Sequence, residues 1–211
     1  GFYRIGDYQA LSASLRYFSL GEVYLADGEN MTSATSGMTI KPYELAFDLG
    51  YSRILGRTWS AAVAMRFIFS DITYDYSSES SPGKAFAADI ALYHQHYFMM
   101  GSRECQFNFG LNLNNIGSKI TYGGSDNAEF IPANLRLGVG LIIPFNEYNR
   151  IGLYADANKL MVPTWPRDSV GNPVGQNSKE AQEKYYDKSS IGGIFSSFGD
   201  APGGLKEELQ E

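Results

Sequence analysis

The chain has 211 residues, a formal net charge of −6 and a pI near 5.0. This balance argues against binding along a nucleic-acid backbone, which needs a basic surface. No apolar run approaches the roughly 18 residues of a transmembrane helix. Only 19% of residues are charged, while 14% are aromatic, with 15 Tyr and 23 Gly. A length that suits one large β domain, combined with this composition, is typical of a β-barrel with aromatic girdles.

Strands that alternate apolar and polar residues follow one another along the chain. Residues 1–8 resemble a strand end and a turn at Gly6-Asp7. The clearest strand is 104–113, where apolar residues hold every odd position and polar residues or Gly every even one. Its ten residues match the roughly nine to eleven of a membrane-spanning strand. The same pattern predicts strands at 9–23, 43–54, 58–70, 84–98, 129–143 and 148–160.

The connections between these strands alternate in length. They are long at 24–42, 71–83 and 117–128 and from 161 onward, and short at 55–57, 99–103 and 144–147. Outer-membrane barrels have short periplasmic turns and longer outer loops, whereas a soluble all-β domain has no reason to sort its loops. We therefore expect an all-β, antiparallel transmembrane β-barrel in residues 1–160.

The polar strand positions carry mostly Ala, Gly, Ser and Asn, which suit the concave interior of a barrel. Two sets of charges on this face predict contacts. A turn centred near Asn146 would place Arg136 directly opposite Asp156. Arg66 is likewise expected within a pair or two of Glu44 or Asp48. We interpret these groups as compensating charges in a solvated lumen, with contacts to a substrate as the alternative.

No catalytic, cofactor or metal motif is present. The lone Cys105 falls on the apolar side of its strand, and a small buried or lipid-facing side chain is its expected role. His94 and His96 share a strand face without a third ligand, which is a weak metal signal. No Gly-x-Ser-x-Gly elbow, phosphate loop or paired Cys occurs. We predict a protein that is not an enzyme.

Residues 161–211 form a different kind of segment, in which Pro and Gly indicate a long outer loop. A capping-type Ser predicts a short helix at 178–188, and a second short helix is expected at 204–209. Between them, 192–199 is an apolar patch flanked by glycines. Exposed aromatic residues of the outer loops are candidates for partner binding, and packing of the outer loop over the barrel mouth is the alternative. They are Tyr24, Tyr74, Tyr76, Tyr122, Trp165, Phe195 and Phe198.

The predicted strands leave open edges, which are costly in lipid. The chain is therefore expected to be the middle of a longer barrel, with 161–211 leading to the next, missing strand. The start, Gly1-Phe2-Tyr3-Arg4, is not a signal peptide, so a mature chain or a fragment is expected.

Three stretches in the same order resemble the PorV family of the Bacteroidetes type IX secretion system. They are RYFSLGEV at 16–23, LNNIGSKITY at 113–122 and FIPANLRLG at 130–138. The resemblance spans most of the chain and implies a FadL-like barrel of fourteen strands, about half of them here. The PorQ-like sister proteins, which have a related barrel, are the second choice.

The resemblance also implies a function without catalytic residues, in the outer membrane. PorV-like proteins bind the C-terminal signal domain of cargo emerging from a SprA-type translocon. They carry it to an attachment complex that includes a PorU-type sortase. A FadL-type channel for hydrophobic small molecules is the alternative function. The small polar side chains of the predicted lumen give that alternative no support.

Overall fold

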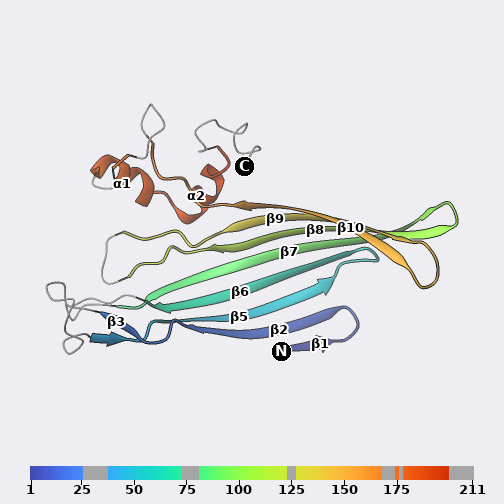
Figure 1. The fold of residues 1–211 in the computed structure, drawn as a ribbon, viewed down its shortest axis with the longest axis horizontal. Coiled ribbons are helices and arrows are strands. Elements are labelled where there is room, and N and C mark those ends of the chain that lie inside the picture. The colour runs from blue at the N-terminus through green and yellow to red at the C-terminus, as the bar shows by residue number, and fades with distance from the viewer. Residues whose placement is uncertain (26–37, 73–80, 123–126, 168–173, 176–177, 200–211) are drawn as a thin grey trace.

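The computed structural model describes residues 1–25, 38–72, 81–122, 127–167, 174–175 and 178–199. An eight-stranded antiparallel sheet forms the body of the molecule, with strand order β1-β2-β5-β6-β7-β8-β9-β10 (Figure 1). Its strands are β1 Phe2–Ile5, β2 Gln9–Ser19, β5 Tyr43–Ile54, β6 Trp59–Asp71, β7 Gly83–Met100, β8 Arg103–Gly117, β9 Asn134–Pro144 and β10 Arg150–Leu160. This architecture confirms the predicted antiparallel all-β class. β1 and β10 lie at the two edges of the described sheet, which is not closed.

The connections are sorted by length onto two ends of the sheet, as predicted. Short turns at 6–8, 55–58, 101–102 and 145–149 lie at one end. Gly6 (φ 61°) and Gly101 (φ 66°) supply the left-handed conformations that two of these turns need. The strand ends that the longer connections join lie at the opposite end, which we call the loop end. There the helices α1 (Lys179–Tyr186) and α2 (Ser190–Ser196) lie beside the sheet (Figure 1).

The register gives the sheet two chemically different faces. The apolar face carries rows of large side chains, and one row runs from Leu15 through Phe47 and Phe67 to Phe86. Leu15, Phe47 and Phe86 of this row are exposed, and Met65 on the same face is 72% exposed. The polar face carries mostly small and polar residues, and one row runs through Ser14, Asp48, Arg66 and Ala87. An uncovered apolar face on so long a sheet is what a lipid-facing surface requires.

The hairpin of β9 and β10 has a different register from the predicted one. Arg136 lies opposite Asn158 and Asp156 opposite Gly138, so the expected direct pairing of Arg136 with Asp156 is wrong. The two residues do share the polar face, two positions apart. The side chain of Asn146 accepts hydrogen bonds from the N–H groups of Tyr148 (2.9 Å) and Asn149 (2.8 Å). This builds a five-residue turn, 145–149, which shifts the pairing by two.

Two strand ends also differ from the prediction. The strand expected at 9–23 stops at Ser19, because Gly21 has a φ of 79° and turns the chain. A small two-stranded sheet, β3 (Val23–Leu25) with β4 (Met38–Ile40), then lies within the expected loop at 24–42. The strand expected from 129 begins only at Asn134, because Pro132 has no N–H to donate to the ladder. Among the described residues, no helix is long and apolar enough to span a bilayer.

Candidate functional site

A cluster of charges lies on the polar face, towards the loop end. Arg66 stands directly opposite Asp48, which agrees with the prediction that it lies within a pair or two of Glu44 or Asp48, and it forms ion pairs with Asp48 and with Asp89 (2.9 Å). The side chains of these three residues are only 14–19% exposed. Asp48 also accepts hydrogen bonds from Ser14 (2.9 Å) and from Arg16 (3.0 Å). Two cations thus balance two carboxylates, and the cluster carries no net charge.

A bulge joins this Arg66 cluster to the loop that follows β8. The register between β7 and β8 shifts between Ala88 and Ile90, leaving Asn115 with a φ of 56°. Asn115 donates its backbone N–H to Asp89 (2.8 Å) and its side-chain N–H to the carbonyl of Pro132 (3.0 Å). Its side-chain oxygen accepts from Arg66. One residue therefore ties the strands to the start of β9.

Part of that loop folds onto the polar face. We call residues 118–122 and 127–131 the inward hairpin, because Ile120 and Glu129 form a β-bridge. Ile120 and Ile131 are buried against Ala85 and Ala87, which the register places on the polar face. Tyr122 donates a hydrogen bond to the buried Ser70 (3.0 Å). The small side chains of β7 therefore make room here for a segment of the chain itself.

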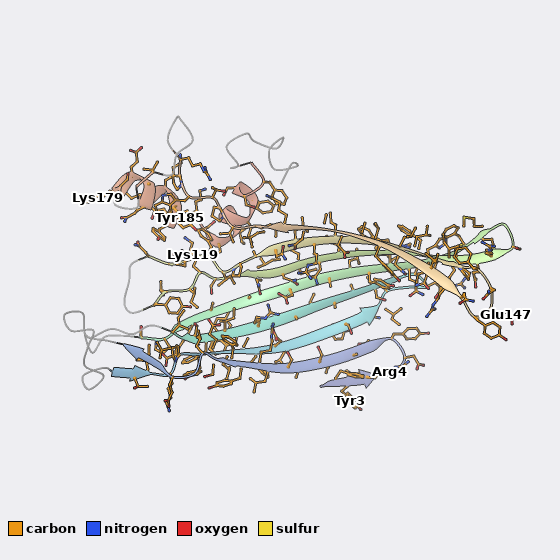
Figure 2. The ribbon with its side chains drawn as sticks, viewed as in Figure 1. Tyr3, Arg4, Lys119, Glu147, Lys179 and Tyr185 are labelled. Carbon is orange, nitrogen blue, oxygen red and sulfur yellow. The ribbon has the colours of Figure 1, made fainter. Side chains whose placement is uncertain are left out.

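A second cluster, the aromatic cap, joins this hairpin to α1 and consists of Phe130, Trp165, Tyr185 and Tyr186. The ring of Tyr185 lies 5.4 Å from that of Phe130 and 4.9 Å from that of Trp165, centroid to centroid. Lys119 lies beside Tyr185 at the loop end, far from Glu147 at the opposite end (Figure 2). The α1 helix begins at its N-cap Ser178, whose side chain accepts from the N–H of Ala181.

Lys119 and Glu129 bind the end of α1. The Lys119 ammonium lies 4.2 Å from the centroid of the Phe130 ring and donates to the backbone carbonyl of Tyr186 (2.6 Å). The Tyr186 hydroxyl donates to Glu129 (2.9 Å). Burial lowers the pKa of Lys119, although nearby Asp187 and Glu129 act in the opposite direction. Burial, together with Glu129, raises the pKa values of Tyr185 and Tyr186. The contacts hold α1 against the inward hairpin.

The α2 helix packs next to this cluster. Ser189 caps it by accepting from the N–H of Gly192 (3.0 Å). Gly193 is buried, and a Cβ there would lie 2.5 Å from the Phe130 ring, so only Gly permits this approach. The apolar patch expected at 192–199 is thus mostly a helix, which the sequence alone did not indicate.

The structure gives the candidate partner-binding residues different roles. Tyr122, Trp165 and Phe198 are engaged in packing, whereas Phe195 is 72% exposed. Tyr24 belongs to β3, while Tyr74 and Tyr76 lie outside the described residues, as does the helix expected at 204–209. Sequence reasoning missed Lys119, which lies in the loop expected at 117–128, and Phe130, which it placed in the strand expected at 129–143.

The two histidines lie on the apolar face near the short turns. The His94 ring packs at a tilt against Trp59 (4.4 Å between ring centroids) and stacks with His96 (6.2 Å). Within the described part of the chain, no group of three or more His, Cys, Asp or Glu residues could hold a metal ion.

Comparison with known proteins gives one family. A family model described as "Type IX secretion system protein PorV" matches residues 1–167. The match covers every strand of the large sheet and ends before α1 and α2. No curated protein matches the sequence.

Proposed function

The chain belongs to the PorV family of type IX secretion system proteins, and from this premise we propose that it is a cargo-carrying barrel of the outer membrane. It binds the C-terminal signal domain of secreted proteins and carries it from a SprA-type translocon to an attachment complex with a PorU-type sortase. One observation carries this proposal: both helices, and the strand ends that the long connections join, lie at one end of a sheet whose apolar face is exposed over most of its length. The lipid holds the sheet, and the loop end meets proteins at the cell surface.

The inward hairpin occupies part of the polar face, and this supports a cargo carrier rather than a channel. The inward hairpin covers Ala85 and Ala87, and the Arg66 cluster joins the strands directly beneath it. Both features stiffen the loop end and reduce the space through which a solute could pass. A FadL-type channel for hydrophobic small molecules, by contrast, needs an apolar path through the polar face.

A photo-crosslinking experiment on the full-length protein in its outer membrane tests the proposal. A photoreactive residue replaces Lys184, which is exposed on α1, or Tyr148, which is 90% exposed in a short turn at the opposite end. We expect cargo signal domains to be captured from position 184 and not from position 148. Capture from position 148 alone would overturn the proposal. Fatty acid that copurifies with a barrel that captures no cargo would favour the channel.

A further inference from the structure

The α2 helix packs on the apolar face of the sheet, not over the polar face. Its Ile194 is buried with Ala133 and Met161, and Leu113 and Leu135 pack against this group. The register shows that this group lies on the apolar face. Leu113 lies opposite Leu135 on one side and opposite Ile90, a residue of the apolar face, on the other. Met161 continues the ladder by donating to Ala133 (2.7 Å). The helix therefore covers the loop end of the surface that the proposed function assigns to lipid.

The opposite side of α2 is apolar and uncovered. Ile191 is 62% exposed and Phe195 is 72% exposed. They are four residues apart, so they project from the same side of the helix. No residue of α2 is charged. An exposed apolar stripe on a short helix is what an interfacial helix buries at the boundary between headgroups and acyl chains.

Two lysines mark the level of α2 on the sheet. Along β10 the apolar face presents Ile151, Leu153, Ala155 and Ala157, and its first charged residue is Lys159. The Lys159 ammonium lies 5.5 Å from the centroid of the Phe198 ring, just beyond α2. Lys188, just before α2, donates to Ser196 (3.3 Å). Lysines at the end of an apolar strand surface indicate where the lipid headgroups lie, because the headgroup phosphates attract the ammonium groups. By this criterion α2 lies at the level of the headgroups.

We propose that α2 is an interfacial anchor in the outer leaflet of the membrane. Ile191 and Phe195 insert among the acyl chains, and Lys159 and Lys188 lie near lipid phosphates. Lipid is the occupant because the exposed side of α2 continues the apolar face and the ammonium groups of Lys159 and Lys188 lie next to the helix. The proposal rests on the proposed function, which places that face in lipid. Its consequence is that the aromatic cap and α1 are held at a fixed height above the membrane.

Depth-dependent quenching tests this anchor on the full-length barrel, reconstituted in phosphatidylethanolamine–phosphatidylglycerol vesicles. An environment-sensitive fluorophore is attached at Phe195→Cys, at Leu137→Cys on the apolar face, or at Glu183→Cys on α1. Cys105 is fully buried and stays unlabelled. Lipids with brominated acyl chains are the quencher. We expect strong quenching at 195 and 137 and little at 183.

The two proposals fail differently in this experiment. Quenching at 137 without quenching at 195 would overturn the anchor and leave the barrel intact. A lack of quenching at both positions would overturn the lipid-facing barrel itself. Adding a purified translocon separates lipid from protein as occupant: protection of 195 only when the translocon is present would also overturn the anchor. As a check on folding, the labelled variants must keep the heat-dependent gel shift of an intact barrel.

Discussion

At the scale of single residues, Arg66 carries the charge balance of the polar face. It binds Asp48, Asp89 and Asn115 from three different strands. Arg66→Met removes the cation that Asp48 and Asp89, both partly buried, share. We expect a loss of about 2–3 kcal/mol in the free energy of unfolding, slightly below the cost of breaking a fully buried pair. Urea unfolding of the full-length barrel in detergent measures it.

Arg16 provides the matched control for this change. It binds the same carboxylate at 3.0 Å, but its side chain is 61% exposed. Arg16→Met should cost less than about 1 kcal/mol, as for surface ion pairs. Equal losses for the two variants would contradict the central role of Arg66.

Gly193 is a second residue with a defined role. A Cβ at this position meets the Phe130 ring at 2.5 Å, so Gly193→Ala must push α2 away from the inward hairpin, at a cost of about 1–3 kcal/mol. We expect faster tryptic cleavage at the lysines of residues 179–188 in the folded barrel. Gly199→Ala is the control, because a Cβ there has no neighbour within 4 Å. Unchanged cleavage in the Gly193 variant would contradict the packing.

The scale of elements shows what the sequence could predict. Strands with strict alternation, such as β8, were predicted because each face of the sheet selects one kind of side chain. The nearness of Arg66 to Asp48 followed from the short turn between β5 and β6. The position of Arg136 was not predictable in the same way, because one Asn146 side chain decides the length of the turn.

Elements that depend on tertiary packing could not be predicted from local pattern. Two adjacent glycines disfavour a helix by about 1 kcal/mol each relative to Ala, yet α2 forms because Gly193 and Ile194 are buried. The inward hairpin shows no period in its sequence, although Ile120, Tyr122 and Ile131 all contact the sheet. The residues that they meet, Ser70, Ala85 and Ala87, are small and gave no sign of a partner.

Disulfide crosslinking tests the register of β9 and β10. Arg136→Cys combined with Asn158→Cys should form a disulfide on mild oxidation, because directly opposite residues come within the Cα separation of about 4.4–6.8 Å that a disulfide needs. Arg136→Cys combined with Asp156→Cys is the matched control, since those positions are diagonal. Non-reducing gel mobility of the unfolded protein reports the yield. Preferential bonding of the second pair would contradict the register.

At the scale of the whole molecule, the two faces of the sheet should differ in their tolerance of charge. Val63 lies on the apolar face and its neighbour Ala62 on the polar face of the same strand. We expect Val63→Arg to lower the free energy of unfolding by about 2–4 kcal/mol, the cost of an arginine deep in lipid. Ala62→Arg should cost clearly less. Unfolding from lipid vesicles measures both, and the reverse order would contradict the assignment of the faces.

The contact between Lys119 and α1 has a consequence for how the sequence can change over evolution. Lys119 donates to the backbone carbonyl of Tyr186, which every amino acid offers, whereas Glu129 binds the hydroxyl that only the tyrosine provides. A substitution at position 186 therefore removes the hydrogen bond to Glu129 and leaves the hydrogen bond from Lys119 in place. Among relatives we expect the lysine at position 119 to be retained more often than the tyrosine at position 186. The contact that holds α1 against the inward hairpin is then kept even where residue 186 differs.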